Sequence, residues 1–526
     1  EYHDLYLKTD VLLLADVFET FRKKWITNYS LDPANYYTLP GLSWQSALKM
    51  TGVRLELLTD PTMWLFFEQS IRGGLTMVSC RHAKANNPYL SNYDPALPTS
   101  YLMYVDANNL YGLSMSMPLA VGKFQWLSEE EINDFNVLNV SNNADIGYVI
   151  ECDLDYPDNL HDLHNDFPLA VEKGVITNEM LSPHSRHLYE QANDDGKEYQ
   201  PSTKLLATLK DKKHYILHYV NLKLYLKLGL VLKKIHNIVS FEQRPWLKQY
   251  IDFNTEMRKK ATSNFEQKLF KNGNNAIFGK SMESLRKHIN FSLCHRWDKF
   301  QKLTAKSSFK SFKIFNDHLC GVLQTKTKIF FNKPIYLGQM ILDLSKAHMV
   351  DYYYNHMKKL YKENVTLCYT DTDSFIMHVR TDDIYRDMSL NSELYDFSNY
   401  PADHPLYTKD RKSIIGLFKD ECKSIQMVEY IGLRAKMYSF ITADDKETVV
   451  AKGIKTRNVR FEQYKNTLFN CSPLLSHMYT LRSFNHQIHM VKVVKSGLSP
   501  YDDKRHLLDD NVHSLAYFHR KLKEKH

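Results

Sequence analysis

The chain has 526 residues, which predicts three or four folding units and excludes a peptide hormone or a small binding module. Hydrophobic residues make up 43% of the sequence and charged residues 24%, a balance typical of a folded, water-soluble protein. The 68 Lys and Arg residues exceed the 60 Asp and Glu residues by eight, so the chain suits a polyanionic partner without requiring one. No run approaches the roughly 18 consecutive apolar residues that a membrane helix needs, so we expect no membrane partner.

The seven cysteines are scattered along the chain, and no two of them form a CxxC pair. This spacing favours neither a disulfide framework nor a zinc module. We interpret them as buried thiols of an intracellular, reducing compartment, and the sequence does not distinguish the nucleus from other such compartments.

Residues 1–29 predict an amphipathic helix, with Val11, Leu14 and Phe18 among its apolar positions. The apolar pattern is established close to the first residue, Glu1, where a domain would normally begin with polar residues. We therefore expect the natural protein to be longer at its N-terminus. A polar stretch rich in Asn and Pro, 86–100, predicts a connector to the next unit.

The middle of the chain alternates predicted strands and helices. Strands are expected at 101–105, 149–154 and 231–241, and a helix at 218–228. Gly229 follows that helix as a C-terminal cap. One long helix is expected over 246–278, interrupted at Gly273, because glycine in a helix costs about 1 kcal/mol relative to alanine.

Residues 365–379 predict two short strands joined at Asp371-Thr372-Asp373. Residues two apart on an extended chain point the same way, so the Asp371 and Asp373 carboxylates would lie roughly 6 Å apart. Their repulsion is about 3 kcal/mol at an effective dielectric near 20. A divalent cation offsets it well, because Mg²⁺ and Mn²⁺ prefer oxygen ligands. The alternative is an ordinary turn whose acids face water.

Asp106 directly follows the strand predicted at 101–105. If it lies beside the hairpin acids, the three carboxylates complete a site for two metal ions, one activating a hydroxyl nucleophile and one steadying a leaving pyrophosphate. Taken alone, Asp106 equally fits an Asx turn at the end of a strand.

A cationic helix is the third informative segment. Lys268, Lys271 and Asn275 fall on one helical face, and the basic run 258–260 precedes them by a few turns. Together these groups suit a triphosphate. The alternative is a basic helix face that is simply solvated.

Taken together, these segments resemble the polymerase half of family B DNA polymerases, and most closely the protein-primed branch found in viruses, linear plasmids and Maverick/Polinton elements. The family motifs DxxSLYP, KxxxNSxYG, YxDTDS and KxY occur here in the family's order. They are matched by Asp106, Leu110 and Tyr111, then Lys271, Asn275 and Gly279, then Tyr369, Asp371, Thr372, Asp373 and Ser374, and finally Lys436 and Tyr438. Each short match is weak alone, but four in order over most of the chain are specific.

Two upstream segments extend the resemblance. Tyr6 and Asp10 match YxxxD, the third motif of the family's 3′–5′ exonuclease, whose first two acidic motifs would precede Glu1. A lone Asp10 cannot assemble a two-metal nuclease site, so we expect no proofreading from this chain. The segment Ile71-Arg72-Gly73-Gly74 resembles the YxGG linker that tracks the single-stranded template.

The resemblance implies roles for single residues. Asp106 and Asp373 would be the principal ligands of two Mg²⁺ or Mn²⁺ ions, supported by Asp371 and the Ala107 carbonyl. Tyr111 would lie under the sugar and exclude a 2′-hydroxyl group.

The remaining implied contacts are to nucleotide and DNA. The triphosphate of the incoming dNTP would be held by Lys271 and Asn275, with Arg258 or Lys259. The DNA contacts would come from Arg72, Gly73 and Gly74 on the template, Phe278 and Gly279 at the templating base, and Lys436 and Tyr438 on the primer. Three positions depart from the family pattern, with Gly112 for Pro, Ala276 for Ser and Phe278 for Tyr.

The implied fold is α+β, a right-hand polymerase with an antiparallel palm sheet, helical fingers and a thumb, preceded by the C-terminal end of an RNase H-like exonuclease domain. The expected units are the exonuclease remnant at 1–30, a connector at 31–100, the palm at 101–160 and 346–450, insertions at 161–203 and 291–345, fingers at 204–290 and a thumb at 451–526. The first insertion would be a region that contacts a terminal protein.

The implied activity is template-directed addition of dNTPs to a DNA primer–template, in the replication of a virus or mobile element that primes with a terminal protein. Three alternatives remain open. An inactive remnant would bind nucleic acid without copying it. A reverse transcriptase typically has YxDD, whereas Thr372 separates the two acids here. A metal-dependent nuclease would leave the Lys271 helix without a purpose.

Overall fold

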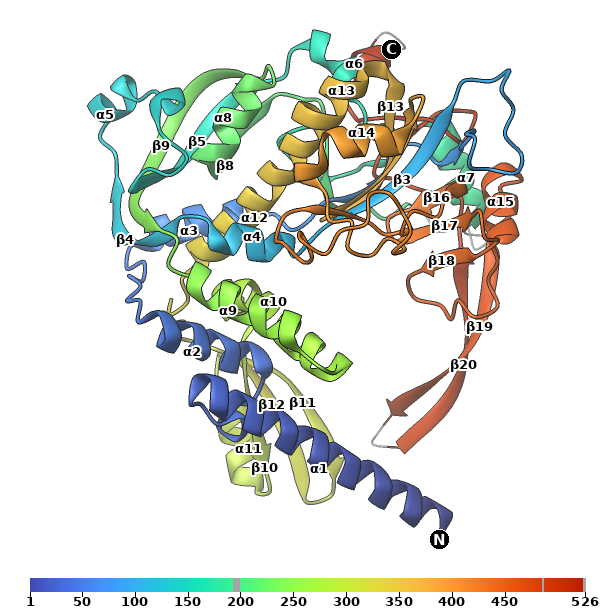
Figure 1. The fold of residues 1–526 in the computed structure, drawn as a ribbon. Coiled ribbons are helices and arrows are strands. Elements are labelled where there is room, and N and C mark those ends of the chain that lie inside the picture. Colours follow the sequence, from blue (N-terminus) through green and yellow to red (C-terminus); the bar gives the residue numbers. More distant parts are fainter. Residues whose placement is uncertain (193–198, 485–486, 524–526) are drawn as a thin grey trace.

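The computed structural model describes residues 1–192, 199–484 and 487–523, so part of the insertion expected at 161–203 lies outside the described residues. A central antiparallel sheet of five strands is surrounded by helices and by smaller sheets (Figure 1). Among the described helices, none is both long and apolar enough to cross a membrane.

The central sheet has the strand order β1-β13-β14-β3-β15, and each neighbouring pair is antiparallel. Its strands are β1 (Thr76–Val78), β13 (Val365–Asp371), β14 (Ser374–Arg380), β3 (Ser100–Ala107) and β15 (Phe418–Asp420). The predictions of a strand at 101–105 and a hairpin at 365–379 are confirmed. The register places Ser374 opposite Asp106, so the end of β3 lies beside the hairpin turn.

A long buried helix supports this sheet. Helix α12 (Ile335–Asp351) is buried along most of its length and continues through a π-helical stretch, Tyr352–Lys358, into α13 (Lys359–Tyr361). The ring of Tyr352 stacks on Phe418 at 3.6 Å between ring centroids, which joins the helix to strand β15. The end of the sheet that carries Asp106 is therefore backed by a packed core.

The helix expected over 246–278 is two helices, α9 (Lys248–Lys260) and α10 (Asn264–Ser281). The interruption lies at 261–263 and not at Gly273, so that expectation was wrong. Ser263 has extended backbone and its side chain accepts a hydrogen bond from the Glu266 N–H, which starts the second helix.

Gly273 has a packing role inside α10. A Cβ atom at this position would lie 3.3 Å from the ring of Trp25, which belongs to α1 (Tyr2–Tyr29). The glycine therefore allows α10 to approach α1 closely, and the packing against Trp25 offsets the cost of glycine inside a helix.

The N-terminal helix predicted over 1–29 is confirmed as α1.

Helix α1 is buried only near its C-terminal end. Trp25 is fully buried and donates a hydrogen bond from Nε1 to Ser46 Oγ at 2.8 Å, in α2 (Leu39–Thr51). Leu14, in contrast, is 68% exposed, and Figure 1 shows the N-terminal half of α1 extending away from the body.

We expect Trp25→Ala to lower the free energy of unfolding by about 3–5 kcal/mol, because a large buried side chain would leave a cavity between α1, α2 and α10. Urea denaturation followed by circular dichroism measures this change. Leu14→Ala is the control and should be nearly neutral, since this side chain is exposed. Equal effects of the two substitutions would contradict the packing described here.

A second antiparallel sheet has the order β4-β9-β5-β8. Its strands are β4 (Leu119–Trp126), β9 (Val231–Arg244), β5 (Ile146–Asp155) and β8 (Lys212–His218), and α8 (Tyr219–Lys227) precedes β9. The strands expected at 149–154 and 231–241 and the helix expected at 218–228 are confirmed. The sheet joins residues assigned to the palm (101–160) and to the fingers (204–290). Those boundaries cut a hydrogen-bonded sheet and do not follow the fold.

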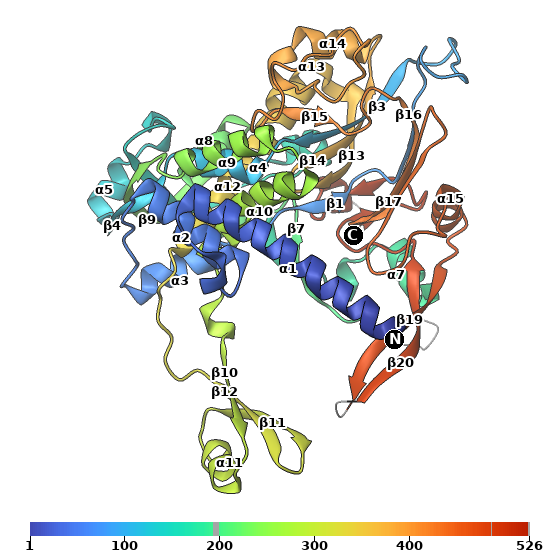
Figure 2. The ribbon, with the colours of Figure 1, turned by 60° about the horizontal axis from the view of Figure 1, so that its bottom comes forward.

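A small unit projects from the body below α2 and α3 (Pro61–Ser70) (Figure 2). It contains β10 (Ile289–Cys294), α11 (Trp297–Thr304), β11 (Phe309–Asn316) and β12 (Leu319–Thr325). The insertion expected at 291–345 is therefore shorter, because α12 is already core at Ile335. Residues 286–333 contain eleven Lys and Arg against two Asp, so the net positive charge of the chain is concentrated here.

The C-terminal part begins with the sheet β18-β17-β16-β2 and continues into a long hairpin. The elements are β2 (His82–Lys84), β16 (Met427–Arg434), β17 (Met437–Thr442), β18 (Glu447–Ala451), α15 (Phe461–Phe469), β19 (Leu474–Phe484) and β20 (Gln487–Leu498). After the hairpin the chain returns to the body as a segment, 499–523, that contains β21 (His506–Leu507), β22 (Ser514–Leu515) and α16 (Arg520–Lys523).

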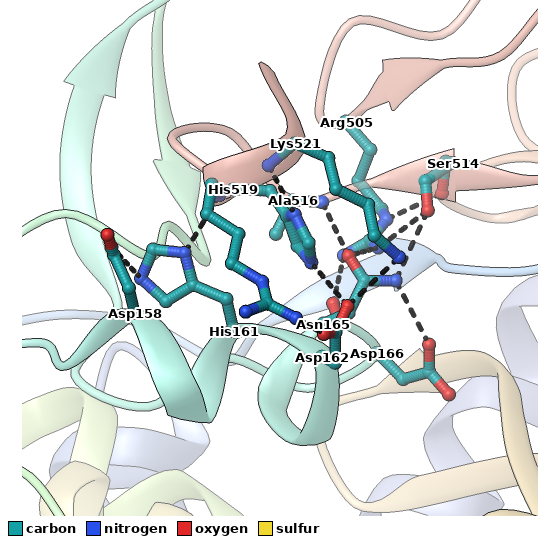
Figure 3. Close-up of polar contacts among 11 residues, drawn as sticks. Asp158, His161, Asp162, Asn165, Asp166, Arg505, Ser514, Ala516, His519 and Lys521 are labelled. Carbon is teal, nitrogen blue, oxygen red and sulfur yellow. Dashed lines mark hydrogen bonds and ion pairs between the residues drawn. The ribbon is translucent and has the colours of Figure 1, made fainter. Parts of the chain in front are cut away.

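This returning segment is held by polar contacts to residues 158–166 (Figure 3). The fully buried Arg505 donates to the Asn165 carbonyl at 2.9 Å and to Ser514 Oγ at 2.7 Å. The rings of His161 and His519 lie 5.6 Å apart between centroids. The end of the described chain is thus part of the body and not a free tail.

The remaining elements cover the edges of these sheets. They are α3 (Pro61–Ser70), α4 (Leu110–Ser116), α5 (Glu129–Asp134), α6 (His161–His164), β6 (Glu172–Val175), α7 (Pro183–Ala192), β7 (Thr203–Leu206) and α14 (Ile384–Leu390). Of these, α4 begins three residues after the end of β3, the strand that carries Asp106, and therefore lies next to the candidate site.

Candidate active site

A cavity of about 440 Å³ lies where the ends of β3 and β14 meet helices α9 and α10. Its walls combine acidic, basic and amide side chains. They are Asp106, Ala107, Asn108, Asn109, Leu110, Tyr111, Arg258, Lys271, Asn275, Asp373, Asn399, Ser413, Lys419, Glu421 and Lys423. The structure therefore brings together residues from the first three motifs, which lie up to 267 positions apart in the chain.

Two carboxylates, Asp106 and Asp373, face this cavity. The backbone fixes them as neighbours, because the Ala107 N–H donates to the Asp373 carbonyl at 2.7 Å. Burial, followed by the nearby negative charge of Asp373, raises the pKa of Asp106 to about 8. Burial also raises the pKa of Asp373. Lys271 opposes both shifts, which places its ammonium group close to both acids.

Asp371 does not line the cavity, although it is two residues from Asp373. Its carboxylate accepts hydrogen bonds from Lys436 Nζ at 2.7 and 2.9 Å, from Thr76 Oγ1 at 2.5 Å and from the Tyr369 hydroxyl at 3.2 Å. The expectation that Asp371 supports the metal ions beside Asp373 is not met by this arrangement. Its charge is already balanced by Lys436.

The reason is the turn between the two acids. Thr372 has a left-handed backbone, with φ of 65°, and the Asp373 N–H donates to the Asp371 carbonyl at 2.7 Å. The rule that residues two apart point the same way holds for an extended strand and not for such a turn. Asp371 ends β13 and Asp373 precedes β14, so their side chains take different partners.

The linker that matches YxGG lies under this turn. The Thr372 N–H donates to the Leu75 carbonyl at 2.8 Å. A Cβ atom added to Gly74 would overlap the Thr372 side chain, whereas one added to Gly73 would meet nothing within 4 Å. Gly74 therefore packs directly against the hairpin turn, which is a structural role. Its contact with template DNA stays a prediction.

The side chain of Arg72 is placed inside the protein and not on a DNA-facing surface. It is 8% exposed, donates from Nη1 to the Ile216 carbonyl at 2.7 Å, and lies 3.9 Å from the centre of the Tyr215 ring. Its backbone carbonyl accepts from Lys346 Nζ at 2.7 Å. The predicted DNA contact of the Arg72 side chain is therefore not supported, and Arg72 instead anchors the linker to β8 and α12.

The predicted triphosphate-binding residues are brought together in part. Lys271, Asn275 and Arg258 line the cavity opposite the two acids. Lys259 does not line it, and its Nζ instead pairs with Glu256 at 2.8 Å on the exposed side of α9. Of the two basic residues considered at 258 and 259, the structure favours Arg258.

Tyr111 and Phe278 join the strand end to the helix α10. Their rings stack at 4.2 Å between centroids and 27° between planes. Burial raises the pKa of Tyr111 to about 12, so its hydroxyl stays protonated and available as a donor at neutral pH. Gly279, one residue after Phe278, has open space where a Cβ would lie.

Lys436 and Tyr438 flank the hairpin from the other side. Lys436 lies in the turn before β17, with φ of 59°, and its ammonium group binds Asp371. Tyr438 is buried, and its hydroxyl lies 3.1 Å from that of Tyr104. Primer contact by these residues stays a prediction.

Tyr6 and Asp10, the residues that match the exonuclease motif, lie on the exposed half of α1. Tyr6 is 58% exposed. Neither lines the cavity, and their relation to an exonuclease stays a prediction.

Sequence reasoning missed the segment around β15. Lys419 pairs in register with Asp106, and Glu421 lines the same cavity and raises the pKa of Asp106. The signal was a charged run, 419–423, directly after a short apolar stretch. Only the pairing of β15 with β3, about 300 positions away, shows that this run belongs to the site.

The donors of this cavity fit a divalent cation. Two closely placed, partly buried carboxylates with raised pKa values are hard oxygen ligands whose repulsion a cation would relieve. In the part of the chain that the structure describes, no three His, Cys, Asp or Glu side chains gather closely enough to hold an ion by themselves. That is compatible with Mg²⁺, which keeps several waters or substrate oxygens among its ligands.

We expect the affinity of the site for Mn²⁺ to increase with pH between about 6 and 8. The pKa of Asp106 is raised to about 8, so below that pH the ion-free carboxyl group holds a proton that the cation must displace. Above it the carboxylate is already charged and the affinity levels off. Titration calorimetry in buffers of different ionisation enthalpy measures both the affinity and the released proton. An affinity that does not change over this range would contradict the shift.

Comparison with solved structures identifies the fold. It is that of phi29 DNA polymerase, a right-hand polymerase with a mixed helical and antiparallel-sheet architecture. The structure of that enzyme in complex with primer–template DNA and incoming nucleotide substrates has a TM-score of 0.51 and 14% sequence identity, covering 88% of this chain and 68% of that one. An orthorhombic crystal form of the same polymerase gives a TM-score of 0.50 and 13% identity, with the same coverage. No protein-family model and no curated protein sequence matches the chain.

Proposed function

We propose that this chain is a DNA-directed DNA polymerase that extends a primer by template-directed addition of dNTPs. The observation that carries the proposal is the cavity in which Asp106 and Asp373 face Lys271 and Arg258. Two acids opposite two bases match the needs of phosphoryl transfer, in which cations and basic groups balance the charge that spreads over phosphate oxygens. The phi29 enzyme, whose fold this chain shares, binds primer–template DNA and nucleotides.

Asp106 and Asp373 would hold the divalent cations, Mg²⁺ or Mn²⁺. When bound, such ions lower the pKa of a hydroxyl nucleophile and neutralise the charge of a leaving pyrophosphate. The residues of the chain do the rest. Lys271 and Arg258 orient the triphosphate, and Asn275 donates to it from the same helix face.

Tyr111 and Phe278 would form the floor on which the sugar and base of the nucleotide rest. Tyr111 lines the cavity, and its ring stacks on that of Phe278, which belongs to α10. A ribose 2′-hydroxyl would meet the Tyr111 ring, which favours deoxynucleotides. Affinity for the DNA would come mostly from contacts to phosphates and would fall with salt.

The proposal includes priming by a terminal protein in the replication of a virus or mobile element. What supports this finer part is the resemblance of the sequence motifs, together with the projecting β10–β12 unit, which overlaps the insertion expected at 291–345. Transfer of a labelled dNMP to a protein hydroxyl, without any DNA primer, is the reaction that tests it.

The main test is primer extension by the purified chain on a defined template with all four dNTPs and Mg²⁺. Incorporation that follows the template and stops with EDTA would support the proposal. Retention of the DNA in a gel shift, without incorporation under any divalent cation, would contradict it and would favour an inactive DNA-binding remnant.

A further inference from the structure

Two cysteines lie next to each other beside the strand that leads to the hairpin turn. Cys368 lies in β13, three residues before Asp371, and Cys80 follows β1 by two residues. The Cys80 N–H donates to the Cys368 carbonyl at 3.4 Å, and the Ser79 N–H donates to the same oxygen at 2.9 Å. The two side chains belong to one buried cluster, in which Cys80 Sγ donates to the His82 carbonyl at 3.3 Å.

Cys368 occupies an irregular position in its strand. In the pairing of β13 with β14, Leu367 lies opposite Met377 and Tyr369 opposite Ile376, so the bulge at Cys368 leaves it without a partner on β14. Its side chain is fully buried and Cys80 is 8% exposed. Both cysteines are therefore buried, and Cys80 is the more exposed of the two.

The surroundings make Cys80 the more reactive thiol of the two. His513 pairs with Cys80 through an isolated backbone bridge, and its Nδ1 lies 2.5 Å from Asp510 Oδ2. The neighbouring Cys368 side chain is the largest of several influences that lower the pKa of Cys80, and the charge of His513 adds to it, while burial and Asp166 act in the opposite direction. The Cys80 side chain in turn raises the pKa of Cys368. A thiol with a lowered pKa next to a second thiol is the arrangement of an oxidation-sensitive pair.

We propose that Cys80 and Cys368 are a site of reversible oxidation, at which hydrogen peroxide converts the two thiols to a disulfide and lowers catalytic activity. The thiolate of Cys80 attacks one peroxide oxygen, the O–O bond breaks, and hydroxide leaves and takes up a proton to become water. The Cys368 sulfur then attacks the resulting sulfenic acid, the S–O bond breaks, and a second water leaves. The two thiols lose two electrons and two protons in total, and the hydrogen peroxide accepts them.

The link would act on the site through β13. A disulfide bond brings two sulfurs closer than any non-bonded contact, so the bulge at Cys368 must shift toward Cys80. Three residues later the same strand carries Asp371, whose side chain binds Thr76 and Lys436, and then the turn that aims Asp373. Small displacements of a reacting group are costly, so the activity should fall. This consequence rests on the proposed polymerase function, whereas the oxidation itself does not.

The test treats the full chain with hydrogen peroxide and follows mass and activity separately. We expect an intact mass lower by two hydrogen atoms and a cross-linked peptide that joins Cys80 to Cys368, both reversed by dithiothreitol. Primer extension should fall roughly tenfold with the same time course and recover on reduction. Cys80→Ser should abolish the cross-link and the inhibition.

Two further variants keep the result interpretable. In Cys368→Ser the sulfenic acid has no partner, so dimedone should label Cys80. Cys294 and Cys320 are register partners in the projecting unit, and the double variant Cys294→Ser/Cys320→Ser should keep the inhibition by peroxide. Absence of the Cys80–Cys368 peptide and of the dimedone adduct would overturn the site. A cross-link in a chain that never extends primers would uphold the site and refute the polymerase function.

Discussion

Replacing Asp106 or Asp373 by asparagine is expected to lower the rate of primer extension by about 10³-fold or more. Each substitution keeps the shape of the side chain but removes one of the two carboxylates assigned to the cations. Without it the site holds a divalent cation poorly, and the several kcal/mol that a cation contributes to phosphoryl transfer are lost. Single-turnover extension of a labelled primer measures the rate, and a gel shift measures DNA binding, which should persist.

Two other acids serve as comparisons for this result. Asp444→Asn, on the exposed turn between β17 and β18, should leave the rate unchanged. Asp371→Asn should have an intermediate effect, because its carboxylate binds Lys436 and Thr76 and does not line the cavity. Undiminished synthesis by the Asp373 variant would refute the assigned role, and equal losses at 371 and 373 would refute the distinction between them.

The elements that sequence reasoning found correctly are those set by local pattern. The strand that ends at Asp106 and the helix that Gly229 closes are each recognisable from a dozen residues, because apolar alternation and capping act over short distances. The motifs also predicted that Asp106, Asp373 and Lys271 meet, and the structure confirms that they line one cavity.

What could not be predicted depends on contacts between distant segments. Lys419 and Glu421 join the site only because β15 pairs with β3, and no local pattern reveals that register. The sequence predicted that Gly273 interrupts a helix. Its packing role depends on Trp25, about 250 residues away, and could not be seen from the local pattern. Asp371 does not line the cavity beside Asp373 for a different reason, since the left-handed residue Thr372 breaks the alternation on which that expectation relied.

Gly74→Ala is expected to lower the rate of primer extension by about 10²-fold or more, because displacement of a reacting group by about 1 Å can have that cost. A Cβ atom at position 74 would overlap the Thr372 side chain, which occupies the turn between Asp371 and Asp373. The overlap cannot be relieved at the end of a long flexible chain, since the Thr372 side chain is short and branched at Cβ. The turn itself must therefore move, and the position of the Asp373 carboxylate changes with it.

Gly73→Ala is the matched control, because a Cβ at the neighbouring position meets nothing within 4 Å and should leave the rate nearly unchanged. The double variant Gly74→Ala/Thr372→Gly should recover much of the lost activity, since glycine removes the overlapping side chain and suits the left-handed backbone at 372. A double-mutant cycle on extension rates therefore distinguishes two roles of Gly74, namely packing against the Thr372 turn and contact with template DNA. If both glycine variants lost activity equally and Thr372→Gly gave no recovery, the linker would act on the DNA and not on the hairpin.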